Sequence, residues 1–209
     1  MKKIFIVIIP FIFISCGTFN PGTIDRRSAA TSPGSKQIDS VYVLVKQYQP
    51  REAELIFDAD FRYYDFEPLY ISVFNKSTKK IIVNPDSVSN FIKISYVNNK
   101  TAQKGFAYFL AWSSPWTLNL LVGWPFYYGI AWPIFGIIAG GKTSGANSRR
   151  EEFYTSNSLK YTELMSGQEI DGILFIKKTK DEPIQIYLNS NDGSQIQFHF
   201  ENNCMMFFK

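Results

Sequence analysis

The chain has few of the side chains that most often carry catalysis or bind metals. Its 209 residues include one histidine, His199. A Ser-His-Asp triad would need His199 as its base, and a zinc site would need Cys or carboxylate partners around it. His199 stands instead in an alternating apolar and polar pattern, which predicts an exposed position on a strand. We therefore expect no enzymatic activity, no catalytic residue, and no metal or other cofactor.

The chain also lacks a clustered charge. It has 22 Lys and Arg against 18 Asp and Glu, and Arg149-Arg150 is followed at once by Glu151-Glu152. Proteins that bind nucleic acid show a clustered basic face. We expect no nucleic-acid partner.

The first residues have the pattern of a secretory signal. Lys2 and Lys3 supply positive charge, residues 4–14 are apolar, and the small Ser15 precedes Cys16. The apolar run is too short for a transmembrane helix, which needs about 20 residues. A cysteine at the cleavage point resembles the lipobox of bacterial lipoproteins, in which that cysteine is acylated and becomes the new N-terminus.

This resemblance implies that residues 1–16 are a lipoprotein signal peptide and that Cys16 is the lipidation site. Only Cys204 would then remain, which excludes an intramolecular disulfide. The alternatives are an ordinary secretory signal with a chance cysteine after it, and an uncleaved N-terminal anchor. The resemblance also implies the bacterial cell envelope. Gly17 is not an inner-membrane retention signal, which favours the outer membrane facing the periplasm.

Residues 17–37 are rich in Gly, Ser, Thr and Pro and contain few large apolar side chains. This composition predicts a flexible tether between lipid and domain, with an r.m.s. span of roughly 25 Å.

From Ser40 onward, short apolar segments of period two alternate with turn residues, which predicts an antiparallel β-sandwich. In the last of these segments, Ile196, Phe198 and Phe200 share one face, and Gln195, Gln197 and His199 share the other. One buried and one wet face is typical of an antiparallel sheet. The strands are expected at residues 41–46, 55–61, 69–74, 81–83, 91–97, 170–176, 184–188 and 194–200, and one helical turn at residues 159–165.

Two separated motifs resemble uncharacterised bacterial envelope proteins with an immunoglobulin-like sandwich. One is the strand that ends in Asn75, with the polar hairpin after it. The other is the later pattern Gly167-x-x-x-x-Gly172 followed by an apolar strand. The resemblance implies a fold and no activity. It places a β-sandwich domain at residues 38–104 and 142–209.

Residues 105–141 contain no charged side chain and interrupt this sandwich. The length exceeds the threshold of about 18 residues for a transmembrane candidate. Both ends must emerge on the same side of the membrane, because a single crossing would split the sandwich across it. We therefore expect an apolar helical hairpin that turns near Gly123 and dips into one leaflet or nearly crosses it. The alternatives are a cover buried by protein and a hairpin that spans the bilayer twice. The aromatic residues expected to contact the membrane are Trp112, Trp116, Trp124, Tyr127, Tyr128 and Trp132.

Residues 136–143 match the phosphate-binding pattern G-x-x-x-x-G-K-[ST]. Such a loop needs a buried strand before it and a helix after it. Residues 144–148 have the composition of a loop, and no doubly wound pattern surrounds them. We expect no nucleotide, and we interpret Lys142 as a lysine at the headgroup level.

The sequence thus predicts a non-enzymatic, membrane-anchored envelope lipoprotein that is an accessory or structural subunit of an envelope complex. Its partners are expected to be membrane lipid and an envelope protein complex. The alternative is a binding protein whose aromatic segment shelters a lipid or another hydrophobic ligand.

Overall fold

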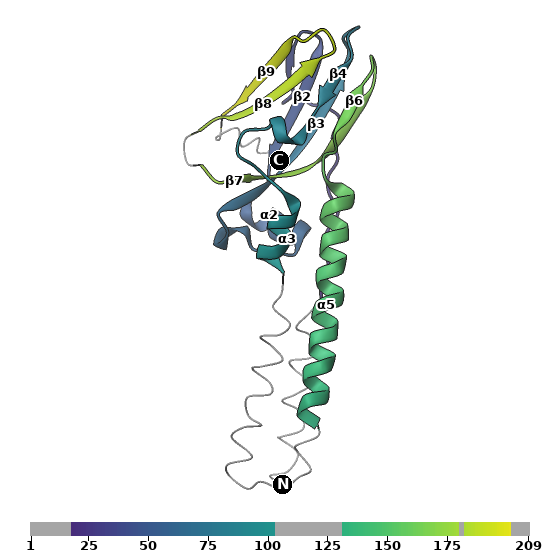
Figure 1. Ribbon diagram of the computed structural model, residues 1–209. Helices are drawn as coiled ribbons and strands as arrows, with labels where there is room; N and C mark the ends of the chain where they lie inside the picture. Colours follow the sequence, from purple (N-terminus) through teal and green to yellow (C-terminus); the bar gives the residue numbers. More distant parts are fainter. Residues whose placement is uncertain (1–17, 103–130, 180–181, 202–209) are drawn as a thin grey trace. The chain divides into compact units, whose positions relative to one another are not determined.

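The computed structural model describes residues 18–102, 131–179 and 182–201, and for residues 131–142 it describes the backbone alone (Figure 1). The chain divides into two compact units. The first unit consists of Met1–Asn20 and Thr101–Glu152, and the second consists of Pro21–Lys100 and Phe153–Lys209.

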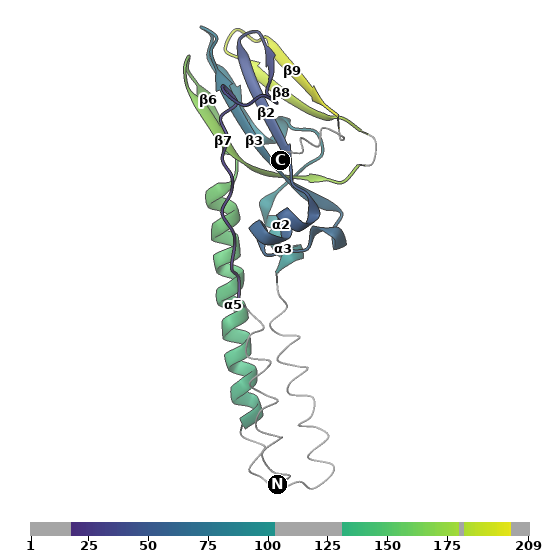
Figure 2. The same cartoon turned by 180° about the vertical axis from the view of Figure 1, so that it is seen from behind.

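The second unit contains two antiparallel sheets, so the protein is mostly β, as predicted (Figures 1 and 2). The first sheet has the order β1 (Lys36–Ile38), β2 (Val41–Gln47), β3 (Phe66–Asn75), β7 (Glu169–Lys177), β5 (Phe91–Ile92). The second has the order β6 (Thr162–Leu164), β4 (Ile81–Val83), β8 (Ile184–Ser190), β9 (Gln195–Phe200).

The two sheets share one hydrophobic core. Val43, Ile71 and Leu174 from the first sheet and Ile186 and Phe198 from the second belong to the same buried cluster. The phase predicted for the last strand is confirmed, since Ile196, Phe198 and Phe200 are buried and the residues between them are exposed. Burial of apolar surface between the sheets therefore holds the sandwich together.

The first sheet is buried on its other face as well. Alternate residues of its strands, such as Leu44, Tyr70 and Phe175, belong to a second cluster that is rich in aromatic rings. Helix α2 (Pro50–Phe57), the short 3-10 helix η2 (Phe61–Tyr63) and helix α3 (Ile94–Thr101) contribute to this cluster. A further 3-10 helix, η3 (Pro85–Ser87), joins β4 to β5.

Three predicted elements were wrong. Residues 55–61 begin in helix α2 and not in a strand, because Pro50 occupies the first turn and Ala53, Ile56 and Phe57 are buried at helical spacing. Leu55 is 69% exposed, although a strand would place it on the same face as the buried Phe57. Residues 91–97 form the short strand β5 and then α3, and residues 159–165 contain strand β6 in place of a helical turn.

Helix α5 (Ala131–Asn157) differs most from the prediction. Residues 131–141 of the apolar segment are helical, but the helix continues through residues 144–148, where a loop was expected. Thr143, Ala146, Arg150 and Tyr154 are all buried and recur at spacings of three and four residues. Packing of this one helical face outweighs the poor helix propensity of Gly, Ser and Asn.

The two separated motifs, at Asn75 and at Gly167–Gly172, lie in contact. The backbone N–H of Asn75 donates to the carbonyl of Gln168 (2.9 Å), and the N–H of Gly167 donates to the carbonyl of Asn75 (2.6 Å). The buried amide of Asn75 also donates to the carbonyls of Lys79 and Leu164. The Asn and the first Gly of the pattern thus close one turn between the two sheets.

Truncation of a core residue in β9 tests the register. Phe198 is fully buried, and Phe198→Ala should lower the free energy of unfolding by about 3–5 kcal/mol. Gln197→Ala, on the exposed face of the same strand, should change it by less than about 0.5 kcal/mol. Unfolding in denaturant followed by far-UV circular dichroism measures both. Equal losses at the two positions would show that the strand phase is wrong.

Candidate functional site

Most residues predicted to contact the membrane lie outside the described part of the chain. This applies to the expected lipidation site, Cys16, and to Trp112, Trp116, Trp124, Tyr127 and Tyr128. Trp132 lies in α5, where only the backbone is described. Within residues 18–102, 131–179 and 182–201, no helix is both long and apolar enough to cross a membrane.

The segment expected to be a flexible tether is instead bound along the sandwich. The N–H of Gly22 donates to the carbonyl of Ile56 in α2 (3.0 Å), and a side chain at Gly22 would meet the carbonyl oxygen of Leu55 at 2.7 Å. Arg26 pairs with Asp171 of β7 (2.7 Å). These contacts order residues 21–35, which we call the strap and which fall within the segment expected to be flexible.

Glu169 at the start of β7 fixes the middle of the strap. Its Oε1 accepts hydrogen bonds from the backbone N–H of Ala29 (2.5 Å) and the hydroxyl of Ser72 (2.7 Å). Its Oε2 accepts one from the hydroxyl of Ser28 (2.7 Å). Hydrogen bonds to a charged acceptor are among the stronger ones in proteins. The carboxylate therefore holds two elements that are far apart in sequence.

Tyr70 of β3 binds the strap next to this carboxylate. Its hydroxyl donates to the carbonyl of Arg27 (2.9 Å) and accepts from the N–H of the same residue (2.8 Å). Burial raises the pKa of the Tyr70 hydroxyl to about 12, against the opposing hydrogen bond from Arg27. The neutral hydroxyl, which can both donate and accept, is thus the form present near neutral pH.

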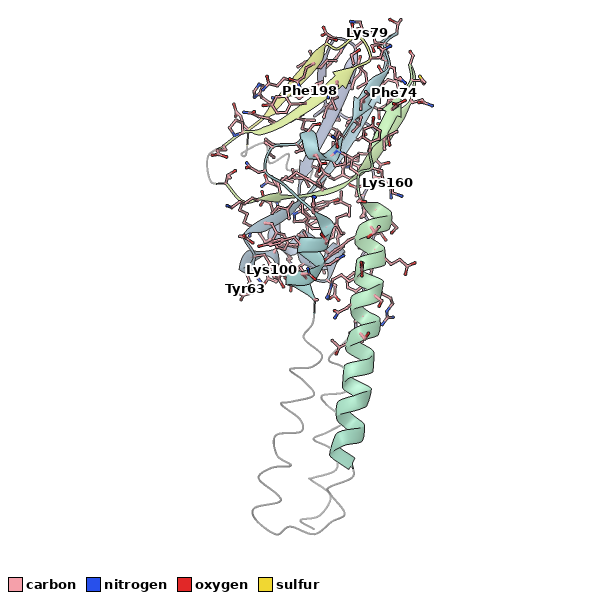
Figure 3. The ribbon with its side chains drawn as sticks, in the orientation of Figure 1. Tyr63, Phe74, Lys79, Lys100, Lys160 and Phe198 are labelled. Carbon is pink, nitrogen blue, oxygen red and sulfur yellow. The ribbon has the colours of Figure 1, made fainter. Side chains whose placement is uncertain are left out.

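The chain leaves the second unit at Pro21, Lys100 and Phe153. Pro21 precedes Gly22, which is bonded to α2, and the ring of Phe153 lies 6.2 Å from that of Phe57 in α2. Lys100 is in α3, whose Tyr96 is linked to α2 through ring contacts with Phe66, Phe61 and Phe57. Figure 3 shows Lys100 and Tyr63 at this helical end of the unit and Lys79 at the opposite end. All three connections therefore leave from the same end of the sandwich.

Within the first unit, Arg150 joins three segments of the chain. Its Nη1 donates to the carbonyl of Thr101 (2.8 Å), at the end of α3, and to Oδ1 of Asn147 (3.3 Å), one turn back on α5. The guanidinium carbon lies 5.0 Å from the ring centroid of Phe19. We call this group, Arg150 with Phe19, Thr101 and Asn147, the arginine junction.

Arg150 is only 3% exposed, which is unusual for an arginine side chain. A buried charge is costly unless it is paired and hydrogen-bonded. The Phe19 ring offsets part of this cost through a cation–π contact of roughly 0.5–2 kcal/mol. No carboxylate pairs with Arg150 in the part of the chain that the structure describes, and there its Nε has no hydrogen-bond partner.

A shallow cavity of about 310 Å³ lies at one edge of the sandwich in the second unit. It is lined by apolar side chains, such as Phe91, Ile94 and Leu159, and by polar ones, such as Asp86 and Lys93. The cavity is open to solvent and mixes both kinds of lining, whereas sites for hydrophobic ligands are mostly apolar and enclosed.

The structure also places His199 and the glycine-rich residues 136–143. His199 is exposed on β9, as predicted, and its backbone carbonyl accepts a hydrogen bond from Lys36. The glycine-rich residues 136–143 are part of α5, so their backbone is helical and does not form a loop around a phosphate. Among the described residues, no group of three His, Cys, Asp or Glu side chains is arranged to hold a metal ion.

The arginine junction is not apparent from the sequence, because Arg149-Arg150 and Glu151-Glu152 cancel in charge along the chain. The available signal was the helical spacing of Arg150 from Ala146 and Tyr154, which places it on the buried face of α5. Recognising that signal required α5 to be predicted as a helix.

No family model, curated protein or solved structure matches this chain.

Proposed function

We propose that this protein is a non-enzymatic lipoprotein of the bacterial cell envelope, anchored through a lipid on Cys16 and facing the periplasm from the outer membrane. Its sandwich, with immunoglobulin-like connectivity, serves as an accessory or structural subunit of an envelope complex. The apolar residues 105–141 brace the anchor as a helical hairpin at the bilayer.

One observation carries this proposal. The three chain connections at Pro21, Lys100 and Phe153 leave the sandwich from the same end. The expected lipidation site lies beyond the first connection, and the uncharged segment lies between the other two. A lipid and an apolar hairpin would therefore both be attached at one end, and neither would divide the sandwich across a bilayer.

The expected lipidation site is close in the chain to an ordered contact. Phe19, only three residues after Cys16, already contacts Arg150. Three residues reach at most about 11 Å, less than half the span expected for a free tether. A short connection fits a protein that is held at a fixed position close to the membrane. A protein that searches for distant soluble partners would need a longer one.

Isolation of the native protein from membranes tests the role. The tagged full-length chain is extracted in a mild non-ionic detergent, and its companions are identified by mass spectrometry of both protein and lipid. We expect a stoichiometric envelope protein, which a strain with the Phe198→Ala variant should retain less well. A tightly held lipid with no protein companion would contradict the proposal and favour the hydrophobic-ligand alternative.

A further inference from the structure

The arginine junction has a charge that the described residues do not balance. Nη1 of Arg150 donates one hydrogen bond to the backbone carbonyl of Thr101 and one to the side-chain amide oxygen of Asn147. Neither carries a negative charge. The ring of Phe19 supplies the third contact, again without a formal charge.

The side of the guanidinium that carries Nε is the one with a vacant donor. Nε–H and the adjacent Nη2–H point in parallel, and this fork matches two oxygens of a carboxylate or a phosphate. Arginine is the usual residue for phosphate recognition because its fork is planar and always charged. The vacant donor at Nε therefore favours an oxyanion with two oxygens on one centre.

The position of the junction in the chain indicates which oxyanion is available. Phe19 lies within about 11 Å of Cys16 along the chain, by the maximum reach of three residues. On α5, Arg150 lies about 12 Å along the helix axis from Lys142, the first charge after the uncharged segment. Both paths connect Arg150 by short distances to segments expected at a lipid surface, where phosphate groups are abundant.

We propose that the arginine junction is a binding site for a phosphate group, with Arg150 as the residue that holds its oxygens. The assignment of that phosphate to a phospholipid headgroup rests on the proposed anchoring at the membrane. Binding of the phosphate itself does not depend on it. Bound there, the anion would neutralise Arg150 at the point where Phe19, the end of α3 and α5 meet.

Titration of the purified full-length protein in non-ionic detergent tests the site. The probes are dihexanoyl-phosphatidylglycerol, inorganic phosphate, and dihexanoylglycerol, which has the same chains without a phosphate. Calorimetry gives the affinities, and the Nε–H resonance of Arg150 in a nitrogen-15 spectrum reports contact at the site. We expect binding of a phosphate-bearing probe with a shift of that resonance, and no shift with dihexanoylglycerol.

The adjacent arginine provides the matched control. Arg149 is exposed on the same helix, and its Nε reaches only the carbonyl of Gly145, at 3.4 Å. Arg149→Gln should leave the affinity unchanged, whereas Arg150→Gln should weaken it by roughly 10- to 100-fold, the worth of a charge-assisted hydrogen bond. Arg150→Lys keeps the charge but not the fork and should give an intermediate affinity.

Several results would overturn the proposal. They are an absence of phosphate binding by the wild-type protein, equal affinity for dihexanoylglycerol, and unchanged affinity in Arg150→Gln. Circular dichroism shows whether the variants fold. If Arg150→Gln does not fold, the affinities of Arg150→Lys and Arg149→Gln are compared, and equal affinities would overturn the proposal. Stronger binding of the phospholipid than of inorganic phosphate identifies a headgroup, and equal binding identifies free phosphate.

The phosphate titration and the lipidation experiment can fail independently of each other. If Cys16 is lipidated and no phosphate binds, this inference fails and the anchoring stands. If phosphate binds and Cys16 carries no lipid, the junction stands as an anion site and the lipid anchor fails.

Discussion

Cys16→Ser should abolish incorporation of a fatty-acid analogue into this protein and leave its signal segment uncleaved. The reason is chemical, because the acyl chains of bacterial lipoproteins are attached through the thiol of the cysteine at the cleavage point, and the peptidase of this pathway acts on the lipidated precursor. A serine hydroxyl cannot replace the thiol in that step. Metabolic labelling followed by gel fluorescence measures the label, and mass spectrometry of the N-terminus measures the cleavage.

The second cysteine supplies the control for this experiment. Cys204→Ser should keep the full label and the normal cleavage, since Cys204 follows no signal pattern. Membrane association is a poorer readout, because residues 105–141 are expected to retain the chain at membranes without a lipid. Equal labelling of the wild type and Cys16→Ser would refute lipidation at Cys16. Loss of the label only in Cys204→Ser would show that Cys204 is the lipidated residue.

Gly172→Ala should destabilise the second unit more than any other exchange of glycine for alanine in β7 or its turns. A Cβ at Gly172 would lie 2.4 Å from the backbone nitrogen of Leu159 and 2.5 Å from its Cα. The backbone of Leu159 is held in place, because its N–H donates to the carbonyl of Ile173 (2.9 Å) and the preceding Ser158 forms a β-bridge with Ile173. Overpacking against backbone costs about 3 kcal/mol or more.

Gly193→Ala is the matched control for this clash. Gly193 has φ +81° in the β8–β9 turn, and nothing lies within 4 Å of a Cβ there. Its substitution should cost about 1–2 kcal/mol through backbone strain alone. Denaturant unfolding followed by far-UV circular dichroism compares the two variants. Tryptophan fluorescence would not report on the second unit, since all the tryptophans lie within residues 105–141. If Gly172→Ala were no more costly than Gly193→Ala, the close approach of Leu159 to β7 would be wrong.

The close approach at Gly172 explains one of the two glycines in the pattern Gly167-x-x-x-x-Gly172. Gly167 adopts φ +81° in a turn bonded to Asn75, and Gly172 admits the backbone of Leu159. The spacing of the two glycines thus has two separate physical causes, a turn conformation and a close approach.

The amino-acid sequence by itself determined the strands that alternate strictly, and it determined their phase. In β9, Ile196 and Phe198 face the core because a strand directs successive side chains to opposite faces. That rule is local, so no knowledge of the partner strand is needed. The pairing of Asn75 with the turn at Gly167 could be suspected from the motifs, but their contact required the folded chain.

Tertiary structure decided between helix and strand where apolar residues were few or ambiguously spaced. Around Leu55 both periods fit, and burial of Ile56 and Phe57 against the first sheet selected the helix. Residues 144–148 became helical because Ala146 and Arg150 are buried on one face of α5. Propensity is worth a few tenths of a kcal/mol per residue, and burial of a helical face outweighs it.

The same distinction applies to the candidate site. The sequence marks Cys16 through a pattern of neighbouring residues, since an export signal is recognised as a linear segment. The arginine junction has no linear pattern, because Phe19, Thr101 and Arg150 are far apart in the chain and meet only on folding. A charge that the sequence shows as locally cancelled is buried away from those neighbours by the turn of α5. Only the tertiary structure reveals that no carboxylate among the described residues pairs with it.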